Sequence, residues 1–240
     1  MQKKLFAVPF SQDKRMAYAK DYLIKNGHEI TDVGRADYVL LPIPVKPEHF
    51  AGLEGKTVFY GFGNYEGYDY NKNESFLLTN SYLTAEGAIA LFKENSEKSL
   101  LGANVLISGY GRIGKALHRL LNAYGSSVTV CDRSNVNRTQ AVHNNAKAIT
   151  LIELSQDNNY DVIFNTVPQL IFSKSEIDAF SKDTMFIELA SFPGGIDKLY
   201  ANSKGVNLID GKQLPLRYSA EAAGALVAKT VLSMIEEGLG

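Results

Sequence analysis

The fold of this chain is decided by one stretch, Val105-Leu106-Ile107-Ser108-Gly109-Tyr110-Gly111-Arg112-Ile113-Gly114-Lys115-Ala116-Leu117. Its apolar start predicts a buried strand, its glycines predict a tight turn, and its end predicts a helix. In a dinucleotide-binding turn of this spacing Gly109 permits the bend, Gly111 leaves room for a diphosphate, and Gly114 lets the helix lie close on the strand. The N–H groups that open the helix then face the anion. The alternative is a strand–turn–helix with no ligand.

A second apolar strand follows that helix and ends in the charged turn Asp132-Arg133-Ser134. Asp132 lies close to the offset of about 20 residues at which an acid accepts hydrogen bonds from an adenosine ribose, which favours NAD. Arg133 and Ser134 instead suit a 2′-phosphate, which favours NADP. The two signals compete, and we expect NADP, with NAD as the alternative.

From residue 104 onward the chain alternates apolar runs with segments of helical length. We expect strands near 104–109, 127–131, 148–152, 161–167, 184–190 and 206–210. This alternation is typical of a doubly wound parallel sheet, the Rossmann type of α/β fold. The expected dinucleotide-binding domain covers residues 99–215.

The first part of the chain predicts a smaller α/β domain over residues 1–98. A strand at residues 5–8 precedes a helix over 13–25, and further strands are expected at 29–33, 38–43, 57–62 and 76–79. Thr84 is expected to cap a helix running from Ala85 to about Glu97. The Ala-rich segment 216–240 predicts a C-terminal helix that packs back on this first domain.

Composition narrows the class of function. The chain has 240 residues, 25 Lys and Arg against 26 Asp and Glu, and a single cysteine, Cys131. The balanced charge favours neither nucleic acid nor an anionic membrane, and no apolar run has the length of a membrane span. One cysteine excludes disulfides, and no His, Cys, Asp and Glu cluster has metal-ligand spacing. We expect a cytoplasmic protein with a small-molecule partner.

Candidate site residues follow the expected strands, because ligands of an open parallel sheet bind beyond the carboxyl ends of its strands. A proline after a strand shapes a turn, and a Pro-Gly-Gly run exposes backbone N–H groups suited to a substrate carboxylate. The alternative for each is an ordinary turn. The residues are Asn165-Thr166-Val167-Pro168 for the cofactor, with Ala190, and Ser191, Gly194 and Gly195 for the substrate.

The segment 80–87 is expected at a helix start facing a cleft between the two domains, where small molecules tend to bind. Ser81 and Thr84 are candidate substrate ligands there, and Glu86 is the candidate base, with Ser191 as a second catalytic group. The alternative for Glu86 is a capping acid without chemistry.

Histidine placement argues against one class of dehydrogenase. All four histidines precede residue 150, and His118 and His143 fall on expected helices. A D-2-hydroxyacid dehydrogenase needs a late His paired with a carboxylate to exchange a proton with the hydroxyl.

Taken together, these motifs resemble the family of the dipicolinate synthase A subunit over nearly the whole chain. The matching residues are Asp13-Lys14-Arg15, Asn80-Ser81 with Thr84, Glu86 and Gly87, Gly109 to Gly114, Arg133-Ser134, Asn165 to Pro168, Leu189-Ala190-Ser191, Pro193 to Asp197, Leu214-Pro215, and Ala223-Gly224. Three segments depart from the family pattern: Phe10-Ser11-Gln12, Phe192 in place of an arginine, and Leu216 to Ser219.

The resemblance implies a flavodoxin-like first domain, a Rossmann domain of hydroxyacid-dehydrogenase type, and a sporulation function. The implied reaction is NADP-linked formation of pyridine-2,6-dicarboxylate from a dihydrodipicolinate-level precursor, with Arg15 among the groups that hold a dicarboxylate. A flavoprotein-like B subunit is the implied partner, and we also expect a homo-oligomer. Two rival functions are another NAD(P)-linked 2-hydroxy- or keto-acid dehydrogenase and a non-catalytic dinucleotide-binding protein.

Overall fold

The computed structural model describes residues 2–156 and 158–238. The chain divides into two compact units, unit 1 with residues 1–83 and 215–240 and unit 2 with residues 84–214. The division falls within one long helix, α2 (Glu74–Asn95), whereas the sequence placed the domain border at residue 98. That border stays a prediction.

Unit 1 is built on a five-stranded parallel sheet with strand order β2-β1-β3-β4-β5. This is the flavodoxin-like order, as expected. The strands are β1 (Leu5–Ala7), β2 (Glu29–Ile30), β3 (Tyr38–Leu40), β4 (Thr57–Tyr60) and β5 (Tyr68–Asp69), with short 3-10 turns at Pro47–Phe50 and Tyr70–Lys72.

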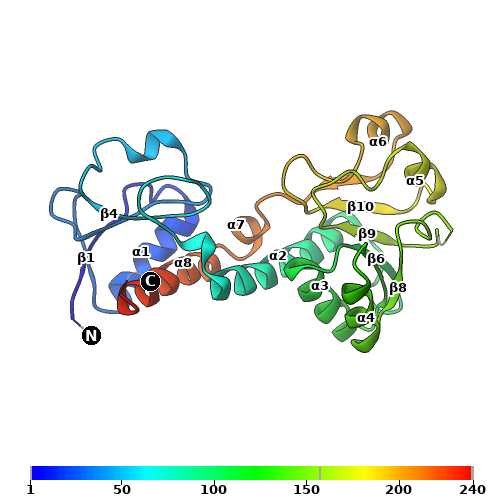
Figure 1. Cartoon of the computed structure of the whole chain (residues 1–240), viewed down its shortest axis with the longest axis horizontal. Coiled ribbons are helices and arrows are strands. Elements are labelled where there is room, and N and C mark those ends of the chain that lie inside the picture. The colour runs from blue at the N-terminus through cyan, green and yellow to red at the C-terminus, as the bar shows by residue number, and fades with distance from the viewer. Residues whose placement is uncertain (1, 157, 239–240) are drawn as a thin grey trace. The chain divides into compact units, whose positions relative to one another are not determined.

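The C-terminal helix α8 (Ala220–Glu236) packs along α1 (Lys14–Lys25), as Figure 1 shows for the red and dark blue helices. Gly224 permits the close approach, because a Cβ there would overlap the carbonyl oxygen of Arg15. The apolar faces of both helices join the core of unit 1 through Met16, Leu23 and Val231. This confirms the expectation that the C-terminal helix packs on the first domain.

Unit 2 is the Rossmann domain expected from the alternation. Its six parallel strands have the order β11-β10-β9-β6-β7-β8, so that the sheet changes winding direction between β9 and β6, as in a doubly wound fold. The strands are β6 (Asn104–Ser108), β7 (Ser127–Cys131), β8 (Lys147–Ile149), β9 (Val162–Asn165), β10 (Met185–Glu188) and β11 (Leu208–Asp210). The connecting helices are α3 (Arg112–Ala123), α4 (Asn135–His143), α5 (Lys174–Ala179) and α6 (Lys198–Lys204), and α7 (Leu214–Tyr218) follows β11.

One expected strand is wrong. Residues 76–79 belong to α2, and the fifth strand of unit 1 lies earlier, at Tyr68–Asp69. A short apolar run fits a buried strand and a helix equally well, and here the side chain of Asn73 accepts from Phe76 N at 3.0 Å and starts the helix. Thr84 therefore lies in the middle of α2 and does not cap it.

Candidate functional site

The glycine turn after β6 has the three properties that a dinucleotide-binding turn requires. Gly109 has φ +88°, and a Cβ at Gly114 would overlap the carbonyl oxygen of Gly109. Gly111 differs from both, because its φ is −76° and a Cβ there would meet nothing within 4 Å. The fold of unit 2 therefore needs Gly109 and Gly114, whereas glycine at position 111 only leaves space open in front of the helix.

That space is bordered by the N-terminus of α3. Gly111 is the N-cap residue and carries no side chain, and the first turn holds no acidic residue. The first N–H groups of an α-helix have no partner within the helix, and together with the positive end of the helix dipole they suit an anion. Within the described part of the chain, this arrangement fits the diphosphate of a dinucleotide.

Tyr110 turns away from the open space and into the protein. Its hydroxyl lies 2.8 Å from Nδ1 of buried His118, and Asn122 Nδ2 lies 2.9 Å from His118 Nε2. Because an amide nitrogen only donates, Nε2 accepts and Nδ1 carries the proton that is donated to Tyr110. His118 is therefore a packing group beneath the turn, and burial lowers its pKa below 6.5.

We expect this histidine to make unit 2 sensitive to acid. As the pH falls below 6.5, the unfolded chain binds a proton that the folded chain excludes, so the free energy of unfolding falls until the pH reaches the lowered pKa. Chemical denaturation at several pH values should show a flatter dependence for His118→Gln than for the unmodified chain. The matched control Gln140→Ala, which alters an exposed residue of α4 that does not titrate, should leave the slope unchanged. Equal slopes for all three proteins would contradict this assignment.

The carboxylate of Asp132, after β7, accepts most of its hydrogen bonds from the protein itself. It accepts from Tyr110 N at 2.8 Å, from Ser134 N at 2.7 Å and from Asn137 Nδ2 at 3.1 Å. A carboxylate has about four acceptor positions, so about one remains for a ribose hydroxyl. Arg133 beside it is exposed, and Ser134 caps α4 by accepting from Asn137 N at 3.4 Å.

Five strands end in polar or sulfur-bearing residues that stand in register. Ser108 pairs with Cys131 and Asn165, and Asn165 pairs with Glu188, which pairs with Asp210. Ser108, Asn165 and Glu188 are fully buried, and the side chain of Asn165 joins the other two. Thr166 Oγ1 donates to Ser108 O at 2.8 Å, so the turn after β9 lies against the glycine turn.

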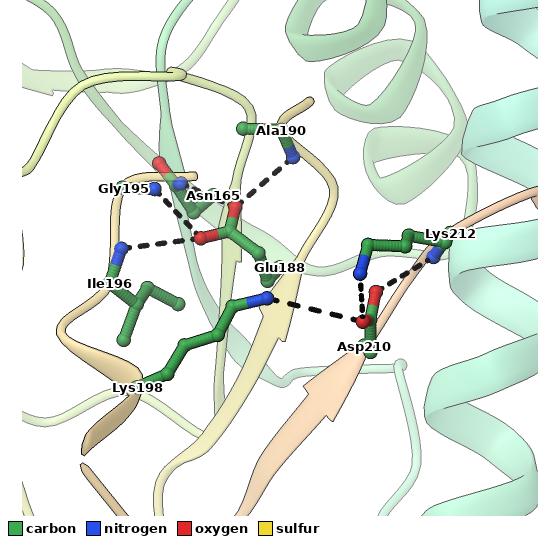
Figure 2. A network of polar contacts seen from close by, with 8 residues as sticks. All are labelled: Asn165, Glu188, Ala190, Gly195, Ile196, Lys198, Asp210 and Lys212. Atoms are coloured by element: carbon green, nitrogen blue, oxygen red, sulfur yellow. Dashed lines mark hydrogen bonds and ion pairs between the residues drawn. The ribbon is translucent and has the colours of Figure 1, made fainter. Parts of the chain in front are cut away.

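The expectation of open amides at residues 194 and 195 is wrong. Gly195 N donates to Glu188 Oε2 at 2.8 Å (Figure 2). Gly194 N donates to Ser191 O at 2.8 Å. The helix α6 begins only at Lys198, behind the N-cap Asp197. A carboxylate does bind at this loop, but it belongs to Glu188 of the same chain.

The expected substrate residues in the first half of the chain have the following positions. Arg15 is buried in unit 1, where it donates to Ile43 O and lies 3.5 Å from the carboxylate of Asp13. Ser81 and Thr84 are buried on α2, and Ser81 Oγ donates to Leu78 O at 2.6 Å. Glu86 is exposed in the middle of α2, not at a helix start.

In unit 2 the structure brings together the expected cofactor residues at the carboxyl ends of adjacent strands. These are Gly109 to Gly114 after β6, Asp132 to Ser134 after β7, Asn165 to Pro168 at the end of β9, and Ala190 after β10. Sequence reasoning missed Glu188. Its signal was a single acid that ends the otherwise apolar run Met185-Phe186-Ile187 in a central strand.

Two further properties concern membranes and metal ions. Among residues 2–156 and 158–238, no helix combines the length and the apolar character needed to cross a membrane. In the same described ranges, no three His, Cys, Asp or Glu side chains are arranged to hold a metal ion.

Comparison with known proteins agrees with this geometry. Residues 80–191 match the NAD-binding domain of D-isomer specific 2-hydroxyacid dehydrogenases. The A subunit of dipicolinate synthase from Bacillus subtilis (strain 168) is 26% identical over 167 residues. The chain is similar to the dipicolinate synthase A subunit. The matched region spans 69% of this chain and 56% of that relative, little more than half of its length.

Solved structures show the same fold. The dipicolinate synthase A subunit from Bacillus halodurans superposes with a TM-score of 0.81 at 21% identity and covers 97% of each chain. The B. subtilis protein gives 0.82 at 19% identity over 99% of this chain and 97% of its own. Apo D-lactate dehydrogenase from Escherichia coli gives 0.67 at 14% identity over 99% and 98%. The resemblance to dipicolinate synthase is thus confirmed, and the cofactor class is a nicotinamide dinucleotide.

Proposed function

We propose that this chain is an NADP-dependent oxidoreductase of dipicolinate synthase type. The observation that carries the cofactor part is the open space at Gly111 in front of an uncapped helix in a Rossmann unit. The similarity to the dipicolinate synthase A subunit supports the reaction. On the same similarity we infer a function in sporulation, and two partners, a second copy of the chain and a flavoprotein-like B subunit.

The proposed reaction is the oxidation of a dihydrodipicolinate to pyridine-2,6-dicarboxylate. One hydride leaves a ring carbon, one proton is released, and the ring becomes aromatic, so that NADP⁺ is converted to NADPH. The bound nicotinamide supplies the hydride acceptor. Gain of aromaticity favours the reaction, so a weak base suffices.

The chain's own groups then have three tasks. The amides that open α3 hold the diphosphate, Ser191 donates to the substrate, and exposed Glu86 accepts the proton. Arg15, Ser81 and Thr84 are our proposed contacts to the dicarboxylate, Arg15 because a guanidinium pairs with a carboxylate in a planar fork.

Assay of the purified chain with a dihydrodipicolinate and NADP tests this proposal. Absorbance of the reduced nicotinamide and of the pyridine product should rise together in equal amounts, with or without a candidate B subunit. Formation of neither under either condition would refute the proposal. Tight dinucleotide binding without turnover would instead identify a non-catalytic protein.

One observation favours a second candidate. The match of residues 80–191 is to 2-hydroxyacid dehydrogenases, so oxidation of a 2-hydroxy acid is the rival activity. No histidine follows residue 143, so the acid/base of that chemistry has no histidine candidate in the last part of the chain, residues 144–240. Assay with 2-hydroxy acids as the alternative substrates separates the two activities.

NADP is preferred in our proposal because Arg133 is exposed and Asp132 is committed to Tyr110 and Ser134. We expect Arg133→Ala to weaken NADPH binding about tenfold, since hydrogen bonds to charged groups contribute about 1.5–3 kcal/mol. NADH affinity should stay unchanged. Fluorescence titration with both coenzymes measures this, and Arg35→Ala, which removes an exposed arginine of unit 1, is the matched control. An equal loss for NADPH and NADH would contradict the assignment of Arg133.

A further inference from the structure

Glu188 is a buried carboxylate held only by neutral donors. It is 2% exposed, and its Oε1 accepts from Asn165 Nδ2 at 2.6 Å and from Ala190 N at 3.1 Å. Its Oε2 accepts from Gly195 N at 2.8 Å and from Ile196 N at 3.2 Å. Four donors fill the acceptor positions of a carboxylate, and such charge-assisted bonds are the strong ones.

The nearby cations serve a different carboxylate. Lys198 and Lys212 lie 3.9 Å and 2.8 Å from Asp210, which is half-exposed at the end of β11 (Figure 2). The two acids thus end neighbouring strands in register but differ in their surroundings. Asp210 forms surface ion pairs, whereas Glu188 binds the backbone of the loop that follows its own strand.

The bonds of Glu188 fix this loop at both ends. Ala190 begins the loop, and Gly195 and Ile196 end it. The end of the loop is also closely packed, because a Cβ at Gly195 would lie 2.5 Å from both Asn165 Nδ2 and Val167 O. Between these anchors lie Ser191 and Phe192, and Phe192 is 93% exposed.

The anchored loop lies on one side of β6. The turn Asp132-Arg133-Ser134, where we expect the adenosine half of the cofactor, lies on the other side. Strand β7, with Asp132 and Arg133 behind it, neighbours β6, and β9 and β10 follow on the opposite side. A dinucleotide whose diphosphate lies at the glycine turn extends over both sides of this switch point. The adenosine half then lies by Arg133, and the nicotinamide half lies towards the ends of β9 and β10.

We propose that Glu188 is a positioning residue that holds Ser191 and Phe192 at the nicotinamide end of the cofactor. The proposal rests on the proposed function for the reaction that Ser191 and Phe192 would face. Its test measures only the binding of ligands and does not depend on that reaction. Glu188 acts through the loop and through Asn165, which also binds Ser108 beneath the glycine turn. Its carboxylate occupies amides of this loop that a substrate carboxylate would otherwise bind, so Ser191 and Phe192 are the groups left to face the substrate.

The test compares two ligands on one variant. In Glu188→Gln an NH₂ group, which cannot accept a hydrogen bond, replaces one of the two carboxylate oxygens. Whichever oxygen is replaced, two donors lose their acceptor, so one end of the loop is released. We expect the affinity for NADPH to fall about tenfold and the affinity for 2′,5′-ADP, which lacks the nicotinamide half, to stay within about twofold of that of the unmodified chain. Asp210→Asn, the same change on the neighbouring strand, should alter neither affinity.

A second variant covers the case in which Glu188→Gln does not fold. Gly195→Ala pushes the loop away from Asn165 while Glu188 keeps its charge, and the same split between the two ligands is expected. Equal weakening of NADPH and 2′,5′-ADP, or unchanged affinity for both, would overturn the proposal. Because neither ligand reports turnover, absence of dihydrodipicolinate oxidation would refute the proposed function and leave this result standing.

Discussion

Gly111→Val is expected to weaken binding of a nicotinamide dinucleotide about 100-fold, which corresponds to about 2.7 kcal/mol. The native φ of −76° suits any residue, and a Cβ at this position meets no protein atom within 4 Å. The valine methyl groups would therefore occupy the space in front of the α3 amides and nothing else. Calorimetric titration with NADPH measures the loss.

The control for this variant is a measurement of its stability, which shows whether it is folded. The added side chain points into open space, so Gly111→Val should lose at most about 1 kcal/mol of stability, the cost of a poorer N-cap residue, and should unfold as a folded protein does on heating. Gly111→Ser adds a smaller group that is also a favoured N-cap, so it should keep or raise the stability and still weaken binding. If Gly111→Val bound NADPH with unchanged affinity, the diphosphate would have to lie elsewhere.

Gly114→Ala is expected to have the opposite profile, a loss of stability of about 3 kcal/mol, at the upper end of the range for overpacking. A Cβ at this position would overlap the carbonyl oxygen of Gly109 and lie 3.5 Å from Ile107 Cγ2. Neither the turn nor β6 can give way cheaply, because β6 is a central strand of the sheet. Denaturant unfolding of unit 2 measures the change.

Gly111→Ala is the matched comparison for Gly114→Ala. Both variants add one methyl group to the same turn, but only the one at position 114 meets backbone. The alanine at position 111 should cost at most about 1 kcal/mol, as a poorer N-cap residue. Equal stability losses in the two variants would show that the close packing of α3 on β6 does not depend on the glycine.

Much of the fold could be predicted from local pattern. The six strands of unit 2 are separated by helices and turns, so each appears as its own apolar run, and all six are confirmed. Residues 76–79 could not be assigned in this way, because four residues are too few to separate a strand from a helix. The start of α2 depends on Asn73, whose capping bond is a property of the folded turn.

The candidate site could be predicted where the role of a residue follows from its spacing in the sequence. It could not be predicted where that role depends on which hydrogen-bond partner the fold supplies. The roles of Gly109, Gly111 and Gly114 follow from their separation in the sequence, and the turn has the geometry they predict. The N–H groups of Gly194 and Gly195 were expected to be open, but a nearby acid on β10 engages one of them. Residue type gives no information on which donor a buried acid binds.

The most direct test of this account is a titration of the ¹⁵N-labelled chain with NADPH, followed by NMR of the backbone amides. We expect the largest shifts at Gly111, Arg112, Ile113 and Gly114, with smaller shifts at Arg133 and Ser134. Saturating shifts confined to other parts of the chain, or no shifts at all with either nicotinamide coenzyme, would contradict the claim that the amides opening α3 bind the diphosphate.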